Sequence, residues 1–199
     1  YGIGLNKEEE KVIAVYDLGG GTFDVSILRI ADGVFDVLST NGNTYLGGDD
    51  MDMAIVEFWK QKNIFKGNPK AQGNTTSQQL RLKAQEAKKH LSKANNFTAA
   101  FQNLNLSITK NEFEALIQPL IDKTITSCSN ALKDAGIVKE NIDAVVMVGG
   151  ATRVPMVKKS VSDFFGKAVN DSLNPDEVVS LGAAIQADIL AGNNQDILL

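Results

Sequence analysis

The sequence predicts an α/β fold built on a mixed β-sheet, with an inserted subdomain. Strand-like segments follow one another near the amino end, at about 11–18, 22–30 and 34–40. A long helical pattern then precedes a further buried strand at about 143–148. A strand that follows such a helix, which itself follows three consecutive strands, indicates a mixed sheet. The segment between them, from about Gly47 to Gln118, is then the inserted subdomain.

The first three strands form a meander. Residues 11–18 read KVIAVYDL, and Gly19 to Gly21 break the strand. Residues 22–30 roughly keep the alternation of a half-buried strand. Asp32-Gly33 is a strong turn signal, so a third strand at 34–40 pairs with the second.

The inserted segment changes to helical periodicity. Apolar residues recur every three or four positions over about Asp49 to Lys62, which predicts a helix. Gly, Pro, Asn, Thr and Ser from Lys66 to Gln79 indicate a loop, and a second helix is expected from Leu80 to Ser92. Phe97 to Ile108 reads as one or two strands with a turn near Asn103.

Helix signals continue to the carboxyl end. Thr109 and Glu112 form a capping box that opens a long helix, and Gly136 ends it. Pro119 should bend or split that helix. Two further helices are expected, from Val154 to Phe165 before Gly166, and from an N-cap at Asn174 to about Leu190.

Composition excludes several classes of protein. The 199 residues carry 20 Lys and Arg against 24 Asp and Glu, a net charge of −4, which argues against a nucleic-acid partner. No apolar run reaches the roughly 18 residues of a membrane span. The single cysteine, Cys128, is expected to be a buried free thiol. The chain begins at Tyr1 without a signal peptide and ends on an apolar tip, so we expect a piece of a longer protein.

The most specific motif lies between the first two strands. Asp17 ends one strand and Asp24 lies early in the next, with Gly19, Gly20, Gly21 and Thr22 between them. Three glycines allow positive φ and a concave nest of N–H groups that suits phosphate. Two carboxylates beside phosphate imply a bound cation, Mg²⁺ through water or a monovalent ion. The alternative is a glycine-rich hairpin turn with two surface acids.

Two further segments could contact a nucleotide. Gly149 and Gly150 follow the buried strand at 143–148, where a flat ring could approach the backbone, and Arg153 could stack on a base. Gln85, Lys88 and Ser92 share one helix face, from which Lys88 and Ser92 could contact ribose hydroxyls. The alternatives are a tight turn with a solvated arginine and a solvated helix face. Asp176, near the last helix start, could equally serve the helix dipole.

Four blocks of the sequence resemble the seventy-kilodalton heat-shock chaperones. They are similar to that family's second phosphate loop, the block after it, its adenosine motif and its last ATPase-domain helix. In this chain they span Val15–Leu28, Thr44–Asp52, Val145–Pro155 and Asn174–Leu190. The resemblance implies an actin-like, ribonuclease-H-like fold, with this chain as the second lobe of the ATPase domain. It also implies a base subdomain at 1–46 and 118–199, an inserted upper subdomain at 47–117, and the start of an interdomain linker at 191–199.

The resemblance also implies roles for single residues. Gly19, Gly20, Gly21 and Thr22 would hold the β- and γ-phosphates of ATP or ADP. Asp17 and Asp24 would order the shell of Mg²⁺, with K⁺ as a further candidate, and the attacking water, so that with Thr22 they form the catalytic set. The residues lining the adenosine pocket would be Lys88, Ser92, Gly149, Gly150, Arg153 and Asp176. Ala151 and Gln85 stand where the family usually has Ser and Glu.

Finer features resemble the branch dedicated to iron–sulfur cluster assembly. These are the short inserted subdomain and the ending AIQADILAGN. The branch implies a cytoplasmic chaperone with a J-domain cochaperone and an iron–sulfur scaffold protein as partners, besides the first lobe and a peptide-binding domain in the same protein. The lobe alone should be essentially inactive, because phosphoryl transfer needs groups on several sides. The alternatives are a general folding chaperone, a small-molecule kinase of actin-like fold, and a non-catalytic binding module.

Overall fold

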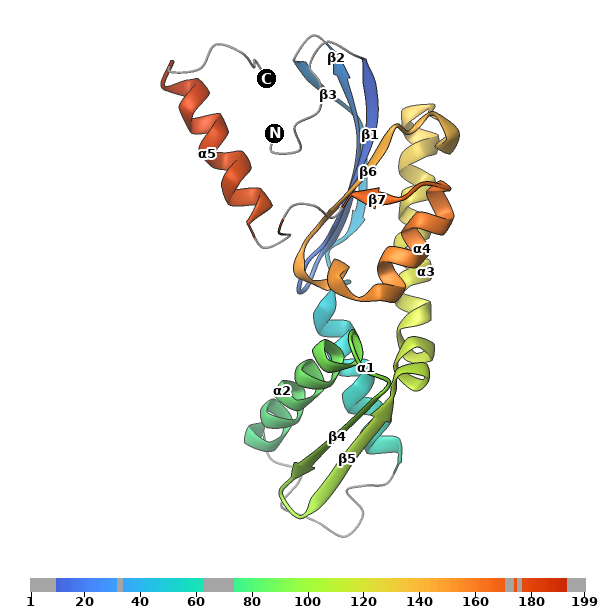
Figure 1. The fold of residues 1–199 in the computed structure, drawn as a ribbon, viewed down its shortest axis with the longest axis vertical. Helices are drawn as coiled ribbons and strands as arrows, with labels where there is room; N and C mark the ends of the chain where they lie inside the picture. The colour runs from blue at the N-terminus through green and yellow to red at the C-terminus, as the bar shows by residue number, and fades with distance from the viewer. Residues whose placement is uncertain (1–9, 32–33, 63–73, 171–173, 175–176, 193–199) are drawn as a thin grey trace.

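A five-stranded mixed sheet forms the base of the computed structural model (Figure 1). The structure describes residues 10–31, 34–62, 74–170, 174 and 177–192. The strand order is β3-β2-β1-β6-β7. The strands are β1 (Lys11–Leu18), β2 (Phe23–Ala31), β3 (Val34–Asn43), β6 (Ala144–Val148) and β7 (Val169–Asn170).

Strand β1 lies at the centre of the sheet and determines its mixed character. It pairs antiparallel with β2, so that Asp17 lies opposite Asp24. On its other side it pairs parallel with β6, where Asp17 lies opposite Val148. The predicted mixed sheet is therefore confirmed, and the carboxyl ends of β1 and β6 meet at one edge.

Helices α3 (Lys110–Ala135) and α4 (Pro155–Phe165) cover one side of this sheet, and α5 (Val178–Leu190) lies on the other side (Figure 1). The buried Tyr16 hydroxyl donates to Thr124 Oγ1 at 2.7 Å, which ties β1 to α3. Helix α5 has no buried residue. Short 3₁₀ turns, η2 (Lys139–Asn141) and η3 (Gly150–Arg153), flank β6.

The inserted segment forms two helices and a hairpin below the sheet (Figure 1). These are α1 (Gly48–Gln61), α2 (Asn74–Leu91), β4 (Asn96–Phe101) and β5 (Leu104–Thr109), and the two strands form a separate sheet. The hairpin turn falls at Gln102 and Asn103, where a turn was predicted. Trp59 is fully buried, and its indole N–H donates to the Ser107 carbonyl at 2.9 Å, which fixes α1 on the hairpin.

Helix α3 begins and ends as predicted. Thr109 Oγ1 accepts from the Glu112 amide at 3.2 Å, and a Glu112 carboxylate oxygen accepts from the Thr109 amide at 2.8 Å. Gly136 ends the helix with φ of 66°. Pro119 does not split the helix, contrary to one expected outcome. Its ring removes a bond to the Ala115 carbonyl, and both residues lie on the exposed face, where water can replace that bond.

Two predicted helix starts are wrong. Helix α2 begins at Asn74, six residues before the predicted Leu80, because exposed polar residues such as Ser77 and Gln78 are helical without an apolar signal. Helix α5 begins at Val178, after a turn in which the Asn174 carbonyl accepts from the Glu177 and Val178 amides.

Cys128 is a buried free thiol, as predicted, and burial raises its pKa to about 12.

In the described part of the chain, none of the helices combines the length and apolar character required to cross a bilayer. Most of the predicted linker, residues 193–199, lies outside the described residues.

We expect Thr109→Ala to destabilise the fold by about 1 kcal/mol, because it removes the hydroxyl that caps α3. Thr126→Ala is a matched control on the same helix, since the exposed Thr126 hydroxyl donates to the Asp122 carbonyl one turn earlier and does not cap the helix. Urea unfolding of both variants at pH 7 measures the difference. Equal stability of the two variants would contradict the capping role.

The Lys62 ammonium, and then the Thr109 amide, lower the pKa of Glu112 to about 2. A depressed carboxyl pKa stabilises the fold above the unfolded value of about 4.3. This contribution should therefore fade as the pH falls from about 4 toward 2.

Candidate functional site

The loop between β1 and β2 is closed by one backbone hydrogen bond. Leu18 pairs with Phe23, and the Gly19 amide donates to the Thr22 carbonyl at 3.0 Å. The expectation of positive φ in this loop is wrong: the described glycines with positive φ are Gly136, Gly149, Gly166 and Gly192. The three loop glycines are therefore not required by a left-handed backbone.

The amino end of α1 holds the carbonyls of this loop. The Gly48 amide donates to the Gly19 carbonyl at 2.9 Å, and the Asp49 amide donates to the Gly20 carbonyl at 2.7 Å. In a planar trans peptide, a carbonyl and the following N–H point in opposite directions. The amides of Gly20 and Gly21 are therefore directed away from α1, and each of the two hydrogen bonds orients one of them.

The glycines around the loop are of two kinds, which differ in whether an added Cβ would have room. A Cβ on Gly20 or Gly21 would meet nothing within 4 Å, so neither glycine is required by packing within the described chain. A Cβ on Gly47 would lie 2.4 Å from the Gly20 carbonyl oxygen, so Gly47 lets α1 approach the loop. The open side of Gly20 and Gly21 suits the close approach of a ligand to the backbone.

Asp17 and Asp24 face each other across the β1–β2 ladder at the base of the loop. Burial, and then the charge of Asp24, raise the pKa of Asp17. Glycines make room on both sides: a Cβ on Gly149 would lie 2.7 Å from Asp17 Oδ1, and one on Gly42 would lie 2.7 Å from Asp24 Oδ1. A carboxylate whose charge is disfavoured by burial and by a second carboxylate across the ladder suits a cation.

These two carboxylates do not form a complete metal site. Among the described residues, no group of three or more Asp, Glu, His or Cys side chains could hold a metal ion. A cation here would therefore complete its shell with water and with oxygen atoms of a ligand. Mg²⁺ keeps several waters and commonly bridges carboxylates to phosphates, so the donor set fits Mg²⁺ bound with a nucleotide.

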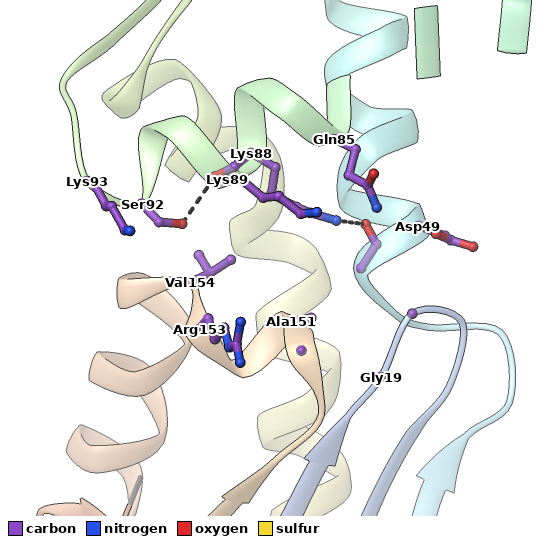
Figure 2. Close-up of a pocket in the computed structure, with 13 residues that line it drawn as sticks. Gly19, Asp49, Gln85, Lys88, Lys89, Ser92, Lys93, Ala151, Arg153 and Val154 are labelled. Atoms are coloured by element: carbon purple, nitrogen blue, oxygen red, sulfur yellow. Dashed lines mark hydrogen bonds between the residues drawn. The ribbon is translucent and has the colours of Figure 1, made fainter. Parts of the chain in front are cut away.

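A pocket of about 560 Å³ lies between the loop, α2 and η3 (Figure 2). Three segments far apart in the sequence therefore meet around it. Of the predicted site residues, the pocket is lined by Gly19, Gly20, Lys88, Ser92, Gly150 and Arg153. Gly21 and Thr22 belong to the same loop, and Asp17, Asp24 and Gly149 lie beside it, without lining this pocket. Asp176 lies outside the described residues.

Lys88 forms a nearly buried ion pair on the pocket wall. Its ammonium lies 2.8 Å from Asp52 Oδ1. It also donates to the Gly48 carbonyl at 2.8 Å (Figure 2). Burial raises the pKa of Asp52, and the Lys88 ammonium opposes that rise. Ser92 Oγ donates to the Lys88 carbonyl at 3.1 Å along α2.

Gly149 and Arg153 have roles that the sequence pattern did not indicate. Gly149 has φ of 86°, and a Cβ there would lie 2.4 Å from the Leu18 carbonyl oxygen. Gly149 therefore serves the backbone and the packing of β6 on β1, a role that the sequence pattern did not indicate. Arg153 donates to Asn174 Oδ1 at 2.6 Å, which links the pocket to the turn before α5.

Several residues of the pocket were absent from the predicted site. They are Gly48, Asp49, Gln85, Lys89, Lys93, Ala151 and Val154, of which Gln85 was weighed only as a helix-face contact. For Gly48, the available signal in the sequence was the Gly47-Gly48 pair at the start of a predicted helix. Lys89 on α2 and Lys93 in the turn after it gave no signal, because exposed lysines are ordinary on a protein surface.

Comparison with known proteins identifies the family. A family model described as "Hsp70 protein" matches residues 1–199. The chain belongs to the Hsp70 family. Among its relatives, a "chaperone protein HscA homolog" of Haemophilus influenzae (strain PittEE) is 47% identical over 195 residues, which are 97% of this chain and 30% of that protein. A "chaperone protein HscA homolog" of Aliivibrio fischeri (strain MJ11) is 48% identical over 193 residues, which are 97% of this chain and 31% of that protein.

Family membership confirms the predicted resemblance and the actin-like α/β fold class. Hsp70 proteins are ATPases that bind ATP or ADP with Mg²⁺, so the ligand class expected from the sequence is confirmed at the level of the family. The chain spans about a third of the length of these curated relatives.

We expect Asp17→Asn to raise the melting temperature of the ligand-free protein at pH 7. A raised carboxyl pKa means that the ionised form is disfavoured in the fold, so neutralising it stabilises the fold. The gain should shrink as the pH falls from 7 toward about 4, and it should vanish below about 4, where the carboxyl is protonated in both the folded and the unfolded chain. Thermal melts between pH 3 and 7 measure this.

Asp36→Asn is the control for this prediction, because Asp36 is an exposed acid on β3 that pairs with Arg29 at 2.9 Å. Its substitution should give no gain at pH 7. Equal melting temperatures for wild type and Asp17→Asn at pH 7 would show that the fold does not disfavour the ionised Asp17 carboxylate.

Proposed function

We propose that this chain is the second lobe of the nucleotide-binding domain of a chaperone ATPase. The observation that carries the proposal is the pocket in which the glycine loop, α2 and η3 converge. The loop offers open backbone at Gly20, α2 offers Lys88, and the turn after α2 offers Ser92. Hsp70 membership supports a nucleotide as the ligand of this pocket.

We assign the phosphates to the loop end of the pocket. The amides of Gly20 and Gly21 would face the β- and γ-phosphates, and the Thr22 hydroxyl would add a donor. The adenosine would lie between α2 and η3, near Lys88, Ser92, Gly149, Gly150 and Arg153, with Asp176 as a further proposed contact. Arg153 can place its planar guanidinium against the base.

Asp17 and Asp24 would hold Mg²⁺ largely through water, and K⁺ is a further proposal for the same carboxylates. Bound Mg²⁺ supplies positive charge that offsets the phosphates. The carboxylates themselves would orient water beside the terminal phosphate and, with Thr22, form the catalytic set on this lobe. The remaining groups would come from the first lobe of the complete protein.

We further propose that the complete protein serves iron–sulfur cluster assembly in the cytoplasm. Nucleotide hydrolysis would control its affinity for client peptides through movement of the two lobes. Its partners would be a J-domain cochaperone and an iron–sulfur scaffold protein, besides the first lobe and the peptide-binding domain. The support is the HscA name of its relatives and the branch features of the sequence. The proposed subdomains remain 1–46 with 118–199, and 47–117, with the linker starting at 191.

We expect Gly20→Ala to weaken MgADP binding by the complete protein about tenfold or more, since the added methyl stands where phosphate approaches and costs about one charge-assisted hydrogen bond. The fold should lose less than about 0.5 kcal/mol, because the methyl enters open space at a residue without positive φ. Calorimetric titration measures the affinity.

Gly182→Ala in α5 is the matched control, because its added Cβ also meets nothing within 4 Å. It should bind MgADP like the wild type. Unchanged affinity in Gly20→Ala would contradict the placement of the phosphates, and a wild type that does not bind MgADP would refute the proposed function.

We expect the isolated 199-residue chain to hydrolyse ATP at least about a hundredfold more slowly than the complete protein, since half of the charge stabilisation is missing. Phosphate release at saturating Mg-ATP measures both rates. Comparable turnover would mean that this lobe holds the whole catalytic set.

A further inference from the structure

The ion pair between Lys88 and Asp52 is nearly buried, where removing charges from water costs free energy. The Asp52 side chain is 2% exposed and the Lys88 side chain 11% exposed. Removing two charges from water costs several kcal/mol per ion, and their attraction repays this only in good geometry. Such a pair contributes little net stability, so its role is to be found in what it contacts.

The pair contacts the first turn of α1, which also binds the glycine loop. The Lys88 ammonium binds the Gly48 carbonyl, while the Gly48 amide binds the Gly19 carbonyl. The next amide, that of Asp49, binds the Gly20 carbonyl. Asp52 itself lies one turn farther along α1, so its carboxylate ties the same helix to Lys88 of α2.

We propose that Asp52 is a positioning residue for the nucleotide site. It holds the Lys88 ammonium on the Gly48 carbonyl and thereby fixes the two α1 amides that capture the loop carbonyls of Gly19 and Gly20. This inference rests on the proposed function, since it assigns the loop to phosphate.

The electrostatic reason concerns the direction of two peptide groups. If α1 released the Gly19 and Gly20 carbonyls, either peptide could rotate and turn its oxygen toward the phosphates. A carbonyl oxygen repels phosphate, whereas the N–H on the other side of the same peptide attracts it. Holding both carbonyls on α1 therefore preorganises the loop before a ligand arrives.

The geometry also connects the two ends of the pocket. Lys88 lines the pocket at its α2 wall, and Gly19 and Gly20 line it at the loop. A ribose that contacts Lys88 would therefore be connected, through the Gly48 carbonyl, to the same first turn of α1 that orients the loop. Asp52, which is almost fully buried, would act on the ligand only through this turn.

The first experiment measures amide hydrogen exchange in the complete protein without nucleotide. In Asp52→Asn, the amides of Gly48 and Asp49 should exchange at least about tenfold faster than in the wild type. The amides of central strand β1 should keep their rates. Glu57→Gln is the matched control, because Glu57 is an exposed acid on the same helix that pairs with Lys60.

The second experiment measures MgADP and adenosine binding by calorimetry. Asp52→Asn should weaken MgADP about tenfold or more and adenosine less than about threefold, because only MgADP uses the loop amides. Glu57→Gln should leave both affinities unchanged. A merely structural role would lower both affinities together, in step with the melting temperature.

If Asp52→Asn does not fold, the double variant Asp52→Leu with Lys88→Met replaces the pair with apolar side chains, which buried sites often tolerate. It should show the same faster exchange at Gly48 and Asp49, and a smaller ratio of MgADP to adenosine affinity. Wild-type exchange at both amides, or an unchanged affinity ratio, overturns the inference. A wild type that binds no MgADP overturns the proposed function instead.

Discussion

Two backbone hydrogen bonds join the loop between β1 and β2 to the first turn of α1, beside the pocket. They run from the Gly48 and Asp49 amides to the Gly19 and Gly20 carbonyls. A helix begins with N–H groups that have no partner within the helix, and a tight loop has carbonyls with the same need. Here the free amides at the start of α1 and the free carbonyls of the loop bind each other. As a consequence, the loop presents its own amides to the opposite side.

This arrangement gives the glycines of the site distinct physical roles. Gly47 lets α1 come within reach of the loop, and Gly149 lets β6 pack beside Leu18 at positive φ. Gly20 and Gly21 have neither role, since nothing in the described chain occupies the space beside them. The open space beside them allows a ligand to approach the loop backbone closely. The same reasoning separates Asp17, whose charge is disfavoured in the fold, from acids such as Asp36 that are already paired.

Much of this fold could be predicted from the sequence, because its signals are local. The alternation of β1 and β2, the Thr109–Glu112 capping box and the glycine at 136 each act over a few residues, and the structure confirms them. The start of α2 was missed since polar helical residues carry no periodic signal.

The predicted site was incomplete for a different reason. Lys88 was predicted as a ligand contact, but its partner Asp52 lies 36 positions away on another helix, and no spacing rule joins them. Likewise, the direction of the loop amides depends on α1, so three glycines in a row suggested a positive-φ nest that the structure does not contain. Contacts between elements determine both the Lys88–Asp52 pair and the direction of the loop amides, and local sequence patterns do not predict such contacts.

The most direct test of this account is a crystal structure of the complete nucleotide-binding domain with MgADP. We expect the phosphates to accept hydrogen bonds from the amides of Gly20 and Gly21, while the Gly19 and Gly20 carbonyls stay on α1. Phosphates bound elsewhere with this loop empty, or a loop whose carbonyls have left α1, would contradict it.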